Sequence, residues 1–142
     1  MHNYEVNLSW LKERKGAISS PDLTQSIEIA TPPEFPKGIE GVWSPEHLFA
    51  AAVNSCLMTT FLAIAENSKL EFVSFNSTAI GKLDKVDGKY MMTEVVLRPV
   101  LVIQNPEQQE RAKRVLDMSE KACLISNSIK STIIFEPVIK IQ

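Results

Sequence analysis

The sequence predicts an α+β protein that folds as one domain over residues 1–142. Two observations carry this prediction. Runs with a period of two, separated by turn residues, indicate antiparallel hairpins at the start and in the middle of the chain. Two further segments, one uncharged from His47 to Ala65 and one amphipathic after Asn105, have the character of helices. The predicted order of elements is β-β-β-α-β-β-α-β.

The first third of the chain predicts three short strands. Alternation over 4–14 places four apolar side chains on one face: Tyr4, Val6, Leu8 and Trp10. Lys15-Gly16 predicts a turn, after which 17–20 returns as a strand. Residues 26–30 predict the third strand. Three prolines and two glycines between Thr31 and Gly41 predict a loop.

Ser44-Pro45-Glu46 predicts the start of the first helix, with Ser at the N-cap, Pro at the first helical position and an acid in the first turn. The helix is expected to run to about Glu66. From His47 to Ala65 it carries no fixed charge, which approaches the length of a membrane span. Its alanines, Asn54 and hydroxyl residues instead indicate a buried helix. A chain this small has little material to cover such a helix, which indicates a partner subunit.

The second half predicts a long hairpin, a helix and a final strand. Extended runs over 71–85 and 89–104 flank Val86-Asp87-Gly88, in which Asp-Gly is a hairpin signal, and Pro99 indicates an edge or a bulge. Asn105-Pro106-Glu107 repeats the helix-start pattern. The expected buried face of that helix consists of Ala112, Val115, Leu116, Ser119, Ala122 and Cys123. Ser126 is a candidate cap for a short turn, and 131–139 predicts the last strand.

Composition excludes several classes of function. A net charge of −2 gives no basic surface for nucleic acid. The first residues lack the pattern of a signal peptide, and two cysteines are too few for a secreted disulfide framework, so a cytoplasmic protein is expected. Two cysteines with His2 and His47 match no zinc-finger spacing, so no metal is expected. No cofactor is expected either.

Cys56 and Cys123 are the candidates for chemistry. A thiol at a helix N-terminus or beside a cation becomes a reactive thiolate, and two thiols brought together by the fold can cycle through a disulfide. The competing interpretation is that both are ordinary buried apolar side chains.

Two parts of the sequence carry a family resemblance. The first, within the run from Ser44 to Cys56, is Pro45-Glu46-x-Leu48-Phe49-Ala50-Ala51 followed by Ser55-Cys56, and the second is the later pair of Cys123 and Ser126. Together they resemble the OsmC/Ohr family of osmotically induced proteins and organic hydroperoxide resistance proteins. The resemblance covers nearly the whole chain. It implies antiparallel sheets packed around two central helices in an intertwined homodimer. It also implies thiol-dependent reduction of organic hydroperoxides, with a dithiol reductant, of lipoyl or another type, resetting the enzyme.

Carried over by position, the resemblance makes Cys56 the thiol that attacks the peroxide and Cys123 the thiol that resolves the sulfenic acid to a disulfide. Glu46 and Arg14 are the implied acid and cation that assist. Leu124 departs from the family pattern, in which a proline usually follows the second cysteine. Peroxide cleavage by a thiolate needs a lowered thiol pKa and a cation near the leaving oxygen, and a carboxylate can orient such a cation.

Spacing sets a condition on these roles. Glu46 and Cys56 are ten residues apart, which is about 15 Å of rise on a straight helix. Either the helix breaks, or Glu46 and Arg14 serve the thiol of the other subunit. Trp43 and Phe49 flank the start of this helix and are the expected lining of an apolar pocket for the alkyl group.

The leading hypothesis is therefore a thiol peroxidase for organic hydroperoxides that needs no metal or cofactor. One alternative is a redox-sensing or small-molecule-binding module of the same fold with little turnover. Another is a structural dimer with inert buried cysteines. None of the three involves nucleic acid or a membrane.

Overall fold

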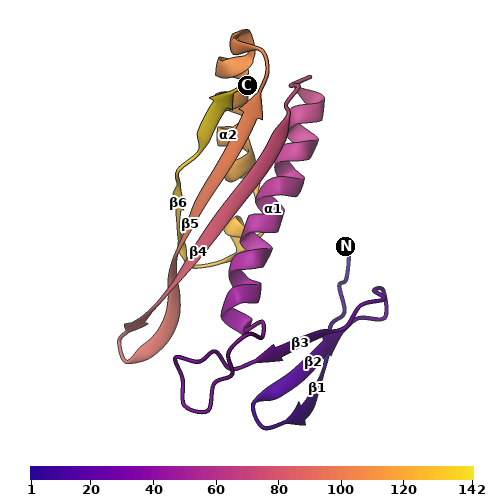
Figure 1. Cartoon of the computed structure of the whole chain (residues 1–142), viewed down its shortest axis with the longest axis vertical. Coiled ribbons are helices and arrows are strands. Elements are labelled where there is room, and N and C mark those ends of the chain that lie inside the picture. Colours follow the sequence, from indigo (N-terminus) through magenta and orange to yellow (C-terminus); the bar gives the residue numbers. More distant parts are fainter. The chain divides into compact units, whose positions relative to one another are not determined.

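The computed structural model describes residues 1–142, which form two compact units, Met1–Leu48 and Phe49–Gln142. The first unit contains a three-stranded sheet and the start of helix α1 (Pro45–Asn67). The second contains most of α1, a four-stranded sheet and helix α2 (Gln109–Ala122). Figure 1 shows these elements and labels both α-helices and strands β1 to β6. The predicted α+β class is confirmed.

The sheet of the first unit is an antiparallel meander of β1 (Asn7–Lys12), β2 (Lys15–Ser19) and β3 (Ile27–Ala30). The three predicted strands are confirmed, but the predicted turn at Lys15-Gly16 is wrong. Lys12 pairs with Lys15, so the turn consists of Glu13 and Arg14, with Glu13 at a φ of 51°.

Gly16 serves close packing in this sheet and not a turn. A Cβ there would come within 3.0 Å of the Ser9 carbonyl oxygen and 3.2 Å of the Leu8 side chain. The glycine therefore allows β1 and β2 to approach each other. A glycine in a strand for this reason gives the same sequence signal as a glycine in a turn.

Helix α1 begins where the sequence predicts. The Oγ atom of buried Ser44 accepts a hydrogen bond of 3.1 Å from the backbone N–H of His47, which satisfies one free donor of the first turn. The helix ends at Asn67, one residue past the expected end. By length and composition α1 could cross a membrane. Only 28% of its most apolar stretch is buried within this chain. Its apolar surface is therefore much larger than this chain covers.

The second sheet is built on one long hairpin. Strands β4 (Ser74–Val86) and β5 (Lys89–Ile103) pair antiparallel around a two-residue turn. Both turn residues have positive φ, 51° at Asp87 and 79° at Gly88, as a tight hairpin turn requires. The predicted hairpin is confirmed.

The last segment differs from its prediction. The single strand expected over 131–139 is two strands, β6 (Thr132–Phe135) and β7 (Val138–Ile141). Both pair with β5, and both run parallel to it, so the sheet is mixed and the expectation of purely antiparallel sheets is wrong.

Pro99 lies inside central strand β5 and marks neither an edge nor a bulge; the irregularity of the hairpin lies between Lys82 and Leu83. On one side Pro99 pairs with Ser77 of β4. On its other side β5 changes partner from β6, which ends opposite Leu97, to β7, which starts opposite Val100. The residue without a backbone N–H thus falls in a gap between two partner strands, where no ladder donor is needed.

Two clusters of buried residues join the helices to β5. Phe61 and Ala65 of α1 meet Leu101 of β5 and Leu116 of α2 in one cluster. The other joins α1 to β5 through Val53, Leu57, Val95 and Leu97. The predicted face of α2 is confirmed at Ala112, Val115, Leu116 and Ser119 but is wrong at Ala122, which is exposed. A short 3₁₀ turn, η1 (Pro106–Gln108), precedes α2, with the Asn105 side chain accepting from the N–H of Glu107.

Candidate functional site

Cys56 and Cys123 are both buried, both free, and hydrogen-bonded to each other in the second unit. Cys56 lies on the same side of α1 as the core residues Val53 and Leu57. Cys123 lies just past the end of α2, where the backbone leaves the helix with φ −63° and ψ 110°. The end of α2 therefore places the Cys123 thiol beside the buried face of α1, where Cys56 lies. We call Cys56, Cys123 and the hydroxyls of Thr60 and Ser126 the dithiol site.

The sulfur of Cys56 accepts hydrogen bonds from several directions. Thr60, one turn further along α1, places its Oγ1 3.8 Å from Cys56 Sγ. The backbone N–H groups of Ile125 and Leu124 and the thiol of Cys123 also donate to it. All these donors favour the charged form of the sulfur. They form an anion-binding environment made mostly of backbone and neutral groups.

The pKa of Cys56 lies below its ordinary value as a result. Burial alone raises the pKa of this thiol, because it disfavours the thiolate. The hydrogen bonds from Ile125 N–H, the Cys123 thiol, the Thr60 hydroxyl and Leu124 N–H act in the opposite direction and together outweigh burial. Cys56 is thus the thiol that ionises first.

Cys123 shows the opposite behaviour. Burial raises the pKa of Cys123. The neighbouring Cys56 raises this pKa further, because its sulfur accepts a hydrogen bond from the Cys123 S–H group and because its negative charge disfavours a second thiolate. Ser126 counters this in part, since its hydroxyl donates to Cys123 Sγ over 3.3 Å and its backbone N–H also donates. Cys123 therefore holds its proton while Cys56 is a thiolate.

The sequence did not reveal these donors. Cys123 was expected on the face of α2, but it follows the helix and adopts an extended conformation. That conformation lets the next residues turn into a second 3₁₀ segment, η2 (Ser126–Ser128), with Ile125 at its N-cap. Ser126 was expected as a cap, but its hydroxyl bonds to a thiol. The backbone donors cannot be recognised from the type of side chain. Thr60 could have been found only from its position four residues after Cys56, which places it on the same side of the helix.

Arg14 and Glu46 lie in the first unit. Arg14 is exposed in the turn between β1 and β2 and, with Glu13 and Lys37, lines a cavity of about 350 Å³. Glu46 is half-buried in the first turn of α1. The two residues make no ion pair with each other in this chain. Because α1 continues unbroken from Pro45 to Asn67, a helix break near Glu46 is excluded.

The two residues expected to line a substrate pocket have different surroundings. Trp43 is half-exposed and borders a cavity of about 310 Å³ together with Gly41, Val42 and His47. Its ring meets that of His47 edge-on, with centroids 6.2 Å apart. Phe49 packs against the cluster of Val53, Leu57, Val95 and Leu97. Trp43 therefore has free apolar surface, and Phe49 is largely a core residue.

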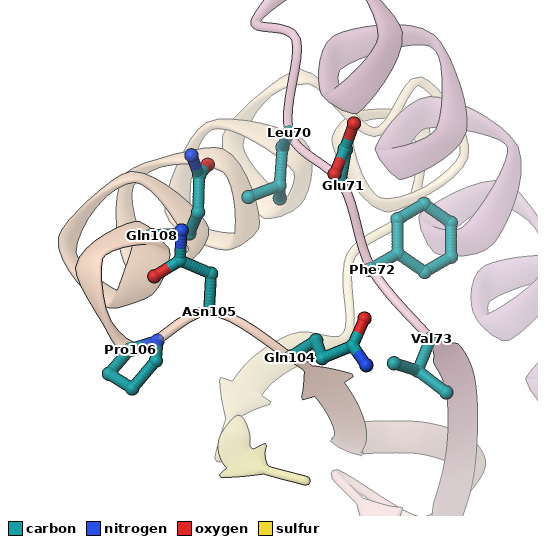
Figure 2. A pocket seen from close by; sticks show the side chains of 8 residues that line it. All are labelled: Leu70, Glu71, Phe72, Val73, Gln104, Asn105, Pro106 and Gln108. Carbon is teal, nitrogen blue, oxygen red and sulfur yellow. The ribbon is translucent and has the colours of Figure 1, made fainter.

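A larger cavity of about 750 Å³ lies elsewhere in the second unit, between the start of β4 and the start of α2. The side-chain oxygen of Gln108 there is buried without a hydrogen-bond partner. Figure 2 shows its lining, which contains neither cysteine: Leu70, Glu71, Phe72, Val73, Gln104, Asn105, Pro106 and Gln108.

The fold and the site together describe a small α+β protein with two buried free thiols beside a long apolar helix. Residues 38–137 match the family described as OsmC-like protein, and the chain belongs to this family. The predicted resemblance is confirmed, and with it the OsmC-like fold with two helices.

Individual relatives agree with this assignment. The chain is 26% identical over 137 residues to the uncharacterized protein YmaD of Bacillus subtilis. The aligned region covers 93% of this chain and 89% of that protein. An OsmC-like protein of unknown function from Vibrio cholerae superposes with a TM-score of 0.86 at 24% identity, covering 97% of this chain and 100% of that one. The organic hydroperoxide resistance protein OhrB of Bacillus subtilis gives 0.72 at 19%, with 98% of each chain covered. At these identities the solved structures show the fold.

Replacing Cys123 by Ala is expected to raise the pKa of Cys56, because the S–H donor disappears. Cys123→Ser keeps a donor in the same place and should raise it less. The rate of Cys56 alkylation against pH measures this, since only the thiolate reacts: lowering pH through the pKa of Cys56 abolishes reactivity. For Ala the rise should be on the order of one pKa unit. Equal pKa values in the wild type and both variants would contradict the proposed donor.

Proposed function

We propose that this protein is a cysteine-based peroxidase that reduces organic hydroperoxides through a Cys56 sulfenic acid and a Cys56–Cys123 disulfide. The observation that carries the proposal is the dithiol site, in which one thiol has a lowered pKa and hydrogen-bonds to a second, protonated thiol. Membership of the OsmC-like family and likeness to a protein named for organic hydroperoxide resistance support the choice of substrate.

The first step is a displacement at oxygen. The Cys56 thiolate attacks the terminal oxygen of the hydroperoxide, an S–O bond forms and the O–O bond breaks. The leaving alkoxide takes a proton from solvent and departs as the alcohol. Cys56 is oxidised by two electrons to a sulfenic acid, and the hydroperoxide is reduced by the same two.

In the second step Cys123 attacks the sulfenic sulfur, the disulfide forms and hydroxide leaves as water. A dithiol reductant, lipoyl or another, then exchanges with this disulfide and restores both thiols. We propose that Arg14 stabilises the thiolate and the departing oxygen, that Glu46 orients Arg14, and that Trp43 and Phe49 contact the alkyl group.

We further propose that the active form is an intertwined cytoplasmic homodimer in which residues 1–142 act as a single domain. Two apolar surfaces support it. On α1, Met58 and Leu62 are 41% and 43% exposed on a helix without charge at that face. On β1, Leu8 and Trp10 are 66% and 76% exposed, and all six residues of the strand face solvent. Single exposed apolar residues are ordinary, but large apolar side chains exposed together on one element indicate a surface that a partner covers.

The proposed dimer would also account for the spacing of the proposed catalytic groups. On unbroken α1 about 15 Å of rise separates Glu46 from Cys56, too far for a direct contact. In the proposed dimer Arg14 and Glu46 of one subunit serve Cys56 of the other.

The competing function is a redox sensor of the same fold, and burial of both thiols is the observation that favours it, because a buried thiol meets peroxide slowly. Repeated turnover separates the two functions. A peroxidase consumes many equivalents of alkyl hydroperoxide when a dithiol is supplied. A sensor oxidises once and resets slowly.

Cys56→Ser is expected to abolish peroxide consumption, whereas Cys123→Ser should retain one oxidation at Cys56. The reason is the order of the two steps, since only Cys123 can convert the sulfenic acid to a disulfide. Intact-mass measurement after one equivalent of alkyl hydroperoxide should show added oxygen on Cys56 in the Cys123 variant. Oxygen on Cys123 in the Cys56 variant would reverse the assigned roles, and no oxidation in the wild type would remove the proposed function.

Leu62→Glu is expected to weaken the dimer at least about 100-fold, because an unpaired carboxylate buried in an apolar interface costs several kcal/mol. Sedimentation velocity at micromolar concentration measures this. Met118→Glu, at a half-exposed apolar position of α2, is the matched control and should leave the dimer intact. A wild-type protein that is a folded monomer under these conditions would contradict the dimer.

Arg14→Ala is expected to slow peroxide reduction roughly 30- to 100-fold, which corresponds to about 2–3 kcal/mol of transition-state stabilisation. If Glu46 acts by orienting Arg14, adding Glu46→Ala should cost little more. Second-order rate constants across this double-mutant cycle test it, with Lys37→Ala as a control from the same cavity. Additive losses would show independent roles, and a loss at Lys37 instead of Arg14 would assign the cation to Lys37.

A further inference from the structure

Each sulfur of the dithiol site has its own hydroxyl donor. Thr60 Oγ1 lies 3.8 Å from Cys56 Sγ, and Ser126 Oγ donates to Cys123 Sγ over 3.3 Å. Both hydroxyl groups come from residues near the sulfur they contact, at i+4 and i+3. The second pair is the more buried of the two, since Cys123 has no exposed surface and Ser126 is 9% exposed.

We propose that Ser126 is a positioning residue for the second half of the reaction: its hydroxyl holds Cys123 and stabilises the Cys123 thiolate once Cys56 is a neutral sulfenic acid. This rests on the proposed peroxidase function. Thr60 serves the first half in the corresponding way, through Cys56. The Thr60 hydroxyl therefore acts in the first step, through Cys56, and the Ser126 hydroxyl acts in the second step, through Cys123.

The order of the steps follows from the charge of Cys56. While Cys56 is a thiolate, its charge and its hydrogen bond with Cys123 keep the proton on Cys123. Of the groups acting on Cys123, only Cys56 does so through its charge. Conversion of Cys56 to a sulfenic acid removes that charge. The interactions that remain are burial, which opposes the thiolate, and the hydroxyl and N–H of Ser126, which favour it.

The chemical balance of this step needs no further reactant. Cys123 gives up its proton, and its sulfur attacks the sulfur of Cys56. The S–S bond forms as the S–O bond breaks, and the departing hydroxide takes up one proton to become water. The hydroperoxide has already accepted the two electrons in the first step.

Burial makes the Ser126 hydroxyl hard to replace. At an exposed site water would take over a lost hydrogen bond, whereas a buried thiolate without its donor has no substitute. Ser128, in the same 3₁₀ turn, gives the contrast. It is exposed, and its hydroxyl donates to the carbonyl of Leu124 over 2.7 Å and not to a thiol.

Two readouts test the proposal, and the first needs no turnover. In Cys56→Ala the neighbour of Cys123 is neutral, as in the sulfenic acid. Ultraviolet thiolate absorbance against pH should show a lower Cys123 pKa in this variant than in the wild type. Adding Ser126→Ala should raise it by about one unit, the effect of one lost hydrogen bond to a charged group. Adding Ser128→Ala should leave it unchanged.

The second readout separates the half-reactions by rapid mixing of the reduced protein with alkyl hydroperoxide. Ser126→Ala should slow disulfide formation about tenfold and leave sulfenic acid formation at the wild-type rate. Thr60→Val should slow only sulfenic acid formation. Thr59→Val is its control, since that hydroxyl bonds to the Cys56 carbonyl at 3.2 Å and not to the sulfur.

The outcomes distinguish this inference from the proposed function. Wild-type turnover with an unchanged resolution rate and an unchanged Cys123 pKa in the Ser126 variants would overturn the inference alone. A wild type that forms no sulfenic acid would remove the function, while the pKa series would still decide whether Ser126 stabilises the Cys123 thiolate. Equal slowing of both steps by Ser126→Ala would show a general structural role and overturn the inference.

Discussion

The proposed chemistry depends on one contact, that between the thiols of Cys56 and Cys123, in which the Cys123 thiol donates to the Cys56 sulfur. Two buried thiols in contact compete for negative charge, because a thiolate on one disfavours a thiolate on the other. The surrounding donors decide the competition. Thr60 and the N–H groups of Leu124 and Ile125 favour charge on Cys56, so Cys123 is left as the protonated partner. The difference between two chemically identical side chains is thus created by their neighbours.

The elements of the second unit hold the two thiols in this contact. Helix α2 ends at Ala122 and Cys123 is extended, and the N–H groups of Leu124 and Ile125 beyond it donate to Cys56. β5 is long enough to pair with β6 and then β7, and the clusters on its buried face join it to both helices. The opposite side of α1 keeps its apolar surface free, which is consistent with the proposed dimer.

Sequence reasoning predicted what side-chain pattern and turn chemistry encode. It located α1 from Ser44-Pro45-Glu46, the hairpin from Asp87-Gly88, and both cysteines from residue type and family resemblance. It failed where backbone geometry and partner choice decide. Gly16 was assigned to a turn although it allows two strands to approach, and Pro99 was assigned to an edge or a bulge although it faces a gap between strands. The donors to Cys56 from Leu124 and Ile125 are backbone groups that any residue but proline supplies, so no pattern of side chains predicts them.

The central claim is that the two thiols titrate as a coupled pair and not as independent cysteines. Thiolate absorbance of the reduced wild-type protein against pH tests it most directly. The account predicts two separate steps of one thiol each, the first below the ordinary value of about 8.5 for a cysteine and the second above it. In Cys56→Ala the lower step should vanish. A single step of two equivalent thiols near the ordinary value would contradict the account.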